Sequence, residues 1–308
     1  MDYKVIENTR DISYEEWLEK RRVKIGGSDA GAICGVNPWS SPASVWLQKQ
    51  EGAEPIPDNE RMRIGRDLED YVAQRFSEAT GLKVRRNNQM MVSKEYPFMI
   101  ANIDREVVGQ KAVLECKTTG SYSKDQWEDG NVPDHYYCQV QHYMAVLGYE
   151  KGYIAVLIGN EDFRWYEIPR DDDYIDFMIK KEKDFYDKNI IGGAFPEPDG
   201  TEAYTEALRK MYRSSNSAQI ELDNLQGIVQ DYKQIQSEIK ALKDQQEKLK
   251  QHIQLEMKEK EIASVGKDKV VWKEFTSRRF DKKKFEEDYP DLAKNYYYET
   301  TSRRFSVK

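Results

Sequence analysis

One stretch, residues 98–117, constrains the fold of this chain more than any other. Two runs within it, residues 100–108 and 111–118, are rich in β-branched and apolar side chains, as strands are. The two residues between them, Gly109 and Gln110, suit a two-residue loop of the type II′ kind, in which glycine comes first. The stretch therefore predicts a β-hairpin, and the length of its loop fixes which residues of the two strands lie opposite each other.

Two carboxylates face each other in this predicted hairpin. With that loop, Asp104 falls directly opposite Glu115, and Lys117 shares their face of the sheet. Like charges in such a pair destabilise a sheet unless something compensates them. A hard divalent cation takes carboxylate oxygens, and a neighbouring ammonium can orient or deprotonate a bound water. The pattern indicates a candidate metal site, and the alternative is a chance pair of acidic residues on a solvated strand.

The same residues resemble a known nuclease signature. Ile103-Asp104, followed by Glu115-Cys116-Lys117, is similar to the PD-(D/E)XK motif, with isoleucine in place of its proline. The resemblance implies Mg²⁺-dependent hydrolysis of phosphodiester bonds, with Mn²⁺ as an alternative ion. It makes Asp104, Glu115 and the backbone carbonyl of Cys116 the metal ligands. Lys117 then orients or activates the attacking water.

A second motif, near the N-terminus, combines arginine with paired glycines. An amphipathic helix would end at Gly26-Gly27, and Ser28-Asp29 would cap a second helix. Helix N-termini and glycine-freed amides bind phosphate, although a helix corner with solvated arginines explains the pattern equally well. The arrangement resembles the N-terminal motif of lambda-type phage exonucleases and YqaJ-like viral recombinases. That resemblance implies that Arg21 and Ser28 bind a phosphate of the DNA end.

Two predicted helices add further candidate residues. Residues 62–80 follow the helical period and carry Glu69, and residues 134–147 carry Gln139. By itself Glu69 has the position of a solvated residue at the edge of an apolar stripe. The family has a glutamate in a Gly-x-x-x-Glu setting, matched here by Gly65 and Glu69, so the resemblance adds Glu69 as a secondary metal ligand. It also implies that Gln139 helps to hold the attacking water or the scissile phosphate.

The order of predicted elements indicates the fold class. Strands and helices alternate as in an α+β protein, with a mixed sheet flanked by helices, as in restriction-endonuclease-like PD-(D/E)XK proteins. We expect this nuclease domain to cover residues 1–213. Residues 214–264 follow, where apolar residues at alternating three- and four-residue intervals predict a long coiled-coil-like helix from about Ser217 to Ile262. Residues 265–308 are predicted to form a small β-α-β module.

The last region contains the pentapeptide Thr-Ser-Arg-Arg-Phe twice, at residues 276–280 and 301–305. Residues 267–308 hold twelve Lys and Arg against eight Asp and Glu, so the region is locally basic. Paired arginines with nearby aromatic side chains suit a surface that contacts phosphates and stacks bases. A module whose aromatic residues form its own core fits equally well. The narrow apolar stripe of the long helix needs a packing partner, which favours a role in assembly.

Composition limits the remaining choices. The net charge of −7 argues against a basic coat over the whole surface, but it is compatible with a basic cleft. Three scattered cysteines predict a reducing cytosol, and they are too few for the four ligands of an iron–sulfur nuclease. No signal peptide and no apolar run of about eighteen residues is present, so we expect a cytoplasmic protein without a membrane partner.

The family resemblance implies one activity, and two alternatives stay open. It implies an exonuclease that digests duplex DNA from a 5′ end, as a ring-shaped homotrimer, and leaves single strand for an annealing protein. One alternative is a structure- or site-specific endonuclease on the same fold, which would also cut closed circular DNA. The other is a non-catalytic module that binds DNA or a partner, which would show no Mg²⁺-dependent cleavage.

Overall fold

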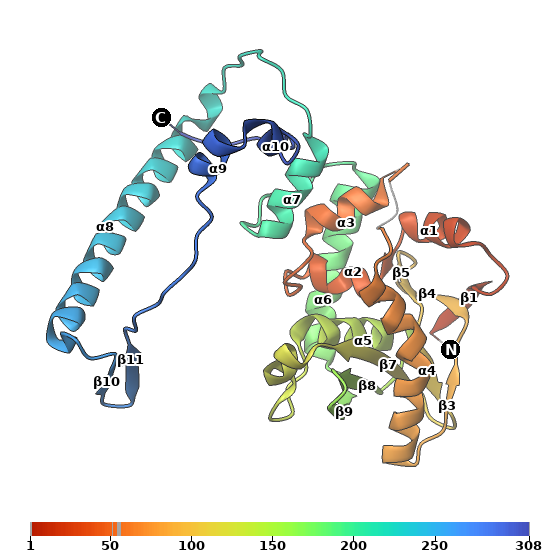
Figure 1. Ribbon diagram of the computed structural model, residues 1–308. Helices are drawn as coiled ribbons and strands as arrows, with labels where there is room; N and C mark the ends of the chain where they lie inside the picture. The colour runs from red at the N-terminus through yellow and green to blue at the C-terminus, as the bar shows by residue number, and fades with distance from the viewer. Residues whose placement is uncertain (1, 51, 54–56, 308) are drawn as a thin grey trace. The chain divides into compact units, whose positions relative to one another are not determined.

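The computed structural model describes residues 2–50, 52–53 and 57–307. The chain divides into two compact units, Met1–Arg213 and Ser214–Lys308, which Figure 1 shows along a colour scale from red to blue. Among the described residues, no helix has the length and apolar character needed to cross a membrane.

The first unit mixes helices and strands along its whole length. In chain order it contains β1 (Tyr3–Asn8), α1 (Tyr14–Arg22), β2 (Ile25–Gly26), α2 (Gly27–Ile33), α3 (Pro42–Lys49), α4 (Glu60–Thr80), β3 (Val84–Arg86), β4 (Gln89–Ser93), β5 (Met99–Ala101), β6 (Arg105–Val107), β7 (Ala112–Thr119), η1 (Ser121–Trp127), α5 (Asp134–Leu147), β8 (Lys151–Ile158), β9 (Asp162–Pro169), α6 (Asp172–Phe185), η2 (Tyr186–Ile191) and α7 (Glu202–Met211). This is the predicted α+β class, with mixed sheets flanked by helices.

A five-stranded sheet forms the centre of this unit, in the order β3-β6-β7-β8-β9. Strands β7 and β8 run parallel, and the other neighbouring strands run antiparallel. Helix α4 covers one face, where Val72 and Phe76 pack with Leu114, and α5 covers the other, where Val140 packs with Val113. Residues of β7 therefore point alternately toward α4 and toward α5, which places Glu115 and Lys117 on the α5 face.

A second sheet has the order β1-β4-β5-β2, with only the β2–β5 pair parallel among its described strands. The sequence pattern did not predict β1, which is held by its pairing with β4 more than eighty residues away along the chain. Short strands such as β1 and β2 carry little periodicity of their own, so tertiary pairing decides them.

The predicted register of the central hairpin is confirmed. Arg105 pairs with Leu114 in the antiparallel β6–β7 ladder, and one step outward this register sets Asp104 opposite Glu115. The side-chain alternation of β7 fixes this register, because a slip of one residue would turn its apolar face toward the wrong side of the sheet.

The hairpin differs from the prediction in two respects. The predicted strand over residues 100–108 is split, because β5 belongs to the four-stranded sheet and β6 to the central sheet. The turn also lies one residue earlier than predicted, since the Gln110 N–H donates to the Val107 carbonyl at 3.2 Å. Gly109 is then the third residue of the turn, with a φ of +80° that favours glycine.

The second unit is built around one long helix. It contains η3 (Asp223–Leu225), α8 (Gln226–Met257), β10 (Ile262–Val265), β11 (Asp268–Val271), α9 (Lys282–Asp288) and α10 (Pro290–Lys294). Helix α8 is shorter than the predicted span from Ser217 to Ile262, because Lys258 leaves the helical conformation with a φ of +52° and Ile262 is paired in the β10–β11 hairpin. The β-α-β prediction for residues 265–308 is wrong in its second strand, since residues 296–300 form neither helix nor strand.

Candidate active site

Asp104 lies at the corner where the chain passes from the four-stranded sheet into the central sheet. Its Oδ2 accepts a hydrogen bond of 2.9 Å from the Cys116 N–H. The N–H and C=O of one strand residue point to the same side of the strand, so the Cys116 carbonyl points toward the same edge as Asp104. Strand β6 does not cover this part of β7, because β6 begins at Arg105 and its described ladder to β7 does not extend past Leu114. Two of the predicted metal ligands therefore meet at this edge.

Glu115 lies beside them and joins the other predicted residues. It is 3% exposed, and its Oε1 accepts hydrogen bonds from Lys117 Nζ at 2.6 Å and from Gln139 Nε2 at 2.8 Å. Lys117 Nζ also donates to Gln139 Oε1 at 3.2 Å. The structure thus brings Asp104, Glu115, Lys117 and Gln139 into one cluster between the start of β6, strand β7 and helix α5.

The cluster holds more negative charge than its own residues neutralise. Burial and the neighbouring Glu115 raise the pKa of Asp104 well above its ordinary value. Burial alone would lower the pKa of Lys117, but Glu115 and Asp104 outweigh it and hold that pKa above its ordinary value, so the ammonium stays charged. The second carboxylate oxygen of Glu115, Oε2, is buried and has no hydrogen-bond partner among the described residues. Two carboxylates with one ammonium, one orphaned oxygen and a strand-edge carbonyl fit a hard divalent cation.

Two tyrosines of α5, neither of them predicted as a site residue, complete the surroundings. The Tyr136 ring lies 4.7 Å from Lys117 Nζ, and Gln139 Nε2 donates to the Tyr143 hydroxyl at 2.9 Å. Tyr136, Gln139 and Tyr143 stand at positions i, i+3 and i+7 of one helix, so they share a face. This helical spacing could have identified both tyrosines from the sequence, because Gln139 on the same face was already a candidate.

Arg21 and Ser28, the predicted phosphate residues, are in direct contact. Arg21 Nη2 donates to Ser28 Oγ at 2.9 Å, and the guanidinium lies over the Trp17 ring, 4.4 Å from its centroid. The paired glycines make room for this arrangement. A Cβ on Gly26 would lie 2.8 Å from Arg21 Nη2, and one on Gly27 would lie 2.6 Å from the ring of Tyr143, which is hydrogen-bonded to Gln139 of the carboxylate cluster.

The predicted cap of the second helix is wrong. Helix α2 begins at Gly27 and not after Ser28-Asp29, because the Asp29 carboxylate reaches back to accept the Gly26 N–H at 2.9 Å. Gly26 thereby becomes the residue that precedes the helix, and Ser28 lies in its first turn, where its hydroxyl meets Arg21.

A buried ion pair between Lys49 and Asp29 contacts the backbone of this motif. Lys49 Nζ lies 2.7 Å from Asp29 Oδ2 and donates to the Arg21 carbonyl oxygen at 3.1 Å, and both side chains are less than a tenth exposed. Burial alone would raise the pKa of Asp29, but Lys49 and Arg21 hold it below its ordinary value. No pattern in the sequence predicts this pair, whose members stand twenty residues apart on different helices.

Replacement of Lys49 by methionine is expected to destabilise the fold by about 3–5 kcal/mol, because it leaves the Asp29 charge buried without its partner. Denaturant unfolding at neutral pH measures this loss. The contribution of the Asp29 charge is complete above its ordinary pKa near 4 and is lost as the pH falls through its lower folded pKa. The difference between wild type and variant should therefore shrink in acid.

Lys20→Met is the matched control for this substitution. Lys20 pairs with Glu7 at 2.8 Å, but its side chain is 42% exposed, so its loss should lower the free energy of unfolding far less than the loss of Lys49 does. An equal, small effect of both substitutions would contradict the role given to Lys49.

Glu69 lies close enough to Asp104 to contribute to the raised pKa of that carboxyl, but its own carboxylate is bound by an arginine. Its carboxylate is paired at 2.5 Å with the buried guanidinium of Arg105, and it comes from α4, on the opposite face of the central sheet from Glu115. In the part of the chain that the structure describes, no group of three or more His, Cys, Asp or Glu side chains converges as a metal site requires. The geometry therefore offers two carboxylates and a carbonyl, without Glu69.

Two other features lie outside the cluster. His142 is fully buried between Glu182, 2.8 Å from its Nδ1, and the Ile100 carbonyl oxygen, 3.0 Å from its Nε2, so it connects α5 to its neighbours.

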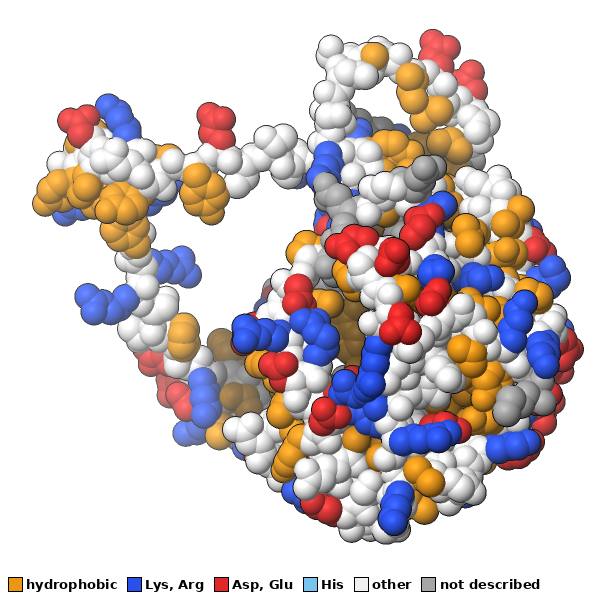
Figure 2. Space-filling model, turned by 90° about the vertical axis from the view of Figure 1, so that its right-hand side faces the viewer, with side chains coloured by type: hydrophobic (Ala, Val, Ile, Leu, Met, Phe, Trp, Pro, Cys, Tyr) orange, Lys and Arg blue, Asp and Glu red, His pale blue; other side chains and the backbone are white. Residues whose placement is uncertain are grey.

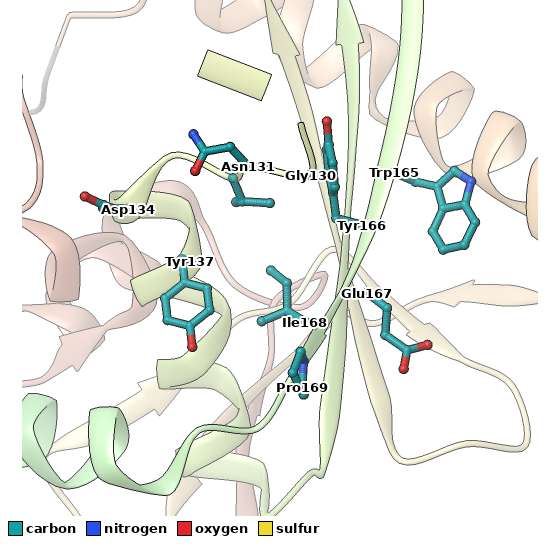
Figure 3. Close-up of a pocket in the computed structure, with 10 residues that line it drawn as sticks. Gly130, Asn131, Asp134, Tyr137, Trp165, Tyr166, Glu167, Ile168 and Pro169 are labelled. Carbon is teal, nitrogen blue, oxygen red and sulfur yellow. The ribbon is translucent and has the colours of Figure 1, made fainter. Parts of the chain in front are cut away.

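A hollow of about 580 Å³ lies between β9 and the loop before α5, and in Figure 3 Tyr137 and Ile168 face each other across it. None of the predicted site residues lines this hollow.

The face of the molecule in Figure 2 carries both signs of charge. On the face that Figure 2 shows, Lys and Arg side chains are interspersed with Asp, Glu and apolar side chains, without a continuous basic coat. This mixture of charges agrees with the net charge of −7.

Comparison with known proteins gives consistent results. Residues 16–150 match the family model described as the YqaJ-like viral recombinase domain, a segment that contains Arg21, Asp104, Glu115, Lys117 and Gln139. LHK-Exo, an alkaline exonuclease from Laribacter hongkongensis, has a similar fold in its complex with dAMP. The structure of LHK-Exo in complex with dAMP has a TM-score of 0.50 at 21% identity, and the match covers 65% of this chain and 98% of that one.

The similarity to one curated protein extends over nearly the whole chain. The uncharacterized protein YqaJ of Bacillus subtilis (strain 168) is 41% identical over 310 residues, which cover 99% of this chain and 97% of that protein. Both compact units, including the long helix and the segment after it, therefore have counterparts in this relative. The chain belongs to the YqaJ-like viral recombinase family.

Proposed function

We propose that this protein is a metal-dependent deoxyribonuclease that hydrolyses phosphodiester bonds of duplex DNA from its ends. The observation that carries the proposal is the cluster of Asp104, Glu115, Lys117 and Gln139, in which a buried oxygen of Glu115 lacks a partner. Membership of a viral recombinase family supports DNA as the substrate, because recombination requires processed DNA ends.

Within this proposal, each residue of the cluster has a role in binding the metal ion or in orienting the attacking water. Asp104, Glu115 and the Cys116 carbonyl would hold Mg²⁺, or Mn²⁺ in its place, at the edge of β7. The chemistry that such an ion supplies is charge neutralisation at the phosphate and a more acidic water. Lys117, kept charged by its neighbours, donates hydrogen bonds to Glu115 and Gln139 and, in this proposal, orients the attacking water. Gln139 fixes the side chains of Glu115 and Lys117 from α5.

The family resemblance supports the finer part of the proposal. In it, Arg21 and Ser28 grip the phosphate at a 5′ end, digestion runs from 5′ to 3′, and the remaining strand passes to an annealing protein in the cytoplasm. A homotrimeric ring around DNA would hold the substrate during successive cuts. Arg21 is suited to a phosphate because its guanidinium is already held by Ser28 and Trp17.

One digestion experiment tests this function. The purified chain is incubated with Mg²⁺ and either linear duplex DNA, with 5′-phosphate or 5′-hydroxyl ends, or covalently closed circular duplex. We expect degradation of the linear DNA, faster with 5′-phosphate, and no cleavage of the circle. Cleavage of the circle would identify an endonuclease instead, and the absence of any Mg²⁺- or Mn²⁺-dependent cleavage would identify a binding module.

A further inference from the structure

Helix α8 presents an apolar stripe that its own unit leaves largely uncovered. The stripe consists of seven residues that are each between 38% and 66% exposed: Ile228, Tyr232, Ile235, Ile239, Leu242, Leu249 and Ile253. Phe305 packs its ring against Tyr232 near the start of the helix, with centroids 5.7 Å apart. The residues further along the stripe remain about half exposed, which is unusual for isoleucine and leucine.

The spacing of the stripe is that of a coiled coil. From Leu225 to Ile253 its positions alternate by three and four residues, so they occupy the a and d positions of successive heptads. Tyr232, Ile239 and Ile253 fall at a, and the d positions hold only isoleucine and leucine. From Ile239 onward, isoleucine at a is combined with leucine at d, the combination that favours two parallel strands.

A polar residue within the stripe selects an orientation. Gln246 occupies an a position between Leu242 and Leu249, both at d. In a parallel, in-register pair, a meets a, so two Gln246 amides face each other and can form hydrogen bonds. In an antiparallel pair, a packs against d, and the amide would be buried among apolar side chains without a partner.

Charges beside the stripe favour the same orientation. Glu238 lies at a g position and Lys243 at the following e position, and in a parallel pair these two positions of opposite chains are adjacent. An antiparallel pair sets g against g and e against e, so Glu238 and Lys243 would not meet. The helix is thus complementary in charge to a second copy of itself in the parallel arrangement.

We propose that α8 forms a parallel, in-register, two-stranded coiled coil with α8 of a second copy of this chain. The 32 residues of α8 span more than four heptads, about 48 Å at 1.5 Å per residue. The interface joins the second units of two copies, so it is additional to the ring contacts, and independent of the nuclease chemistry, that are proposed for the first units. It accounts for the exposed stripe, for the single polar a residue and for the pattern of charge beside it.

Charge exchange in the full-length chain tests this arrangement. Glu238→Lys and Lys243→Glu should each raise the dissociation constant of the α8-mediated complex about five- to thirtyfold, because each creates two like-charge pairs across the interface. The double variant, with both substitutions, should restore wild-type association. Light scattering over a dilution series at low salt measures the mass, and Asp244→Lys, at the outward-facing f position, is the matched control with no expected effect.

Leu242→Asp provides a second readout, since a charge at a central d position should abolish the association and leave DNA cleavage per chain unchanged. Helical content measured by circular dichroism shows whether each variant is folded. The proposal is overturned if the mass is unaffected by Leu242→Asp, if the double variant fails to restore association, or if Asp244→Lys acts as strongly as Glu238→Lys.

Discussion

Replacement of Glu115 by glutamine is expected to lower the rate of DNA cleavage by at least about a hundredfold, the scale for losing a metal ligand or an acid–base group. Glutamine keeps the size of the side chain but removes the charge that pairs with Lys117 and the buried oxygen that lacks a partner. Asp104→Asn and Lys117→Met should have effects of the same scale. Single-turnover digestion of linear duplex DNA with excess enzyme and Mg²⁺ measures the chemical step without product release.

Glu106→Gln is the matched control for these variants. Glu106 lies on β6, close to Asp104 in the chain, but its carboxylate contacts Arg85 and Tyr149 and not the cluster. Cleavage by this variant should stay near the wild-type rate. Thermal unfolding identifies any variant that has lost its fold, and calorimetric titration with Mg²⁺ reports on the ion independently of cleavage. A folded Glu115→Gln protein that cleaves at the wild-type rate would remove Glu115 from the mechanism.

The sequence predicted the central pair of carboxylates because the relevant information is local. The alternation of Leu114 and Cys116 with Glu115 and Lys117 fixes which face of β7 is apolar. Because of this alternation, the predicted register of β6 and β7 is correct, although the turn around Gly109 lies one residue earlier than predicted. Long helices were likewise predictable, since α4 and α5 carry many turns of the helical period.

Contacts between distant segments could not be predicted in this way. Neither the Asp29–Lys49 pair nor the passage of the chain between two sheets before Asp104 leaves a periodic signal. Both depend on strands and helices that are distant in the sequence and meet only in the folded chain. Glu69 shows that a local motif can also leave out a distant partner. Its place in the Gly-x-x-x-Glu motif suggested a metal ligand, whereas in the structure its carboxylate forms an ion pair with Arg105.

The paired glycines connect the two halves of the site. Gly26 leaves room for the guanidinium of Arg21, and Gly27 leaves room for the ring of Tyr143, whose hydroxyl accepts a hydrogen bond from Gln139. The backbone of Gly26 and Gly27 thus lies between Arg21, the proposed phosphate contact, and Tyr143 beside the carboxylate cluster. A DNA end gripped at Arg21 would place a nearby phosphodiester bond within reach of the cluster.

Arg21→Ala is therefore expected to reduce the preference for a 5′-phosphate over a 5′-hydroxyl end by roughly ten- to hundredfold, the scale for a charge-assisted hydrogen bond. The chemical step on DNA that is already bound should change much less, because the carboxylates, Lys117 and Gln139 are untouched. The measurement is the ratio of initial digestion rates on the two kinds of linear end at subsaturating DNA, with the maximal rate determined separately.

Arg22→Ala separates this specific effect from a general loss of positive charge. Arg22 is the next residue on α1, but its guanidinium binds the Glu19 carboxylate at 2.9–3.0 Å, whereas that of Arg21 is held against Ser28. Both substitutions remove one positive charge from the same helix, so a long-range attraction for DNA would weaken equally in both. Only a direct contact with the terminal phosphate makes the ratio of rates fall in Arg21→Ala and stay constant in Arg22→Ala. A ratio that is unchanged in both variants would show that Arg21 does not recognise the terminal phosphate.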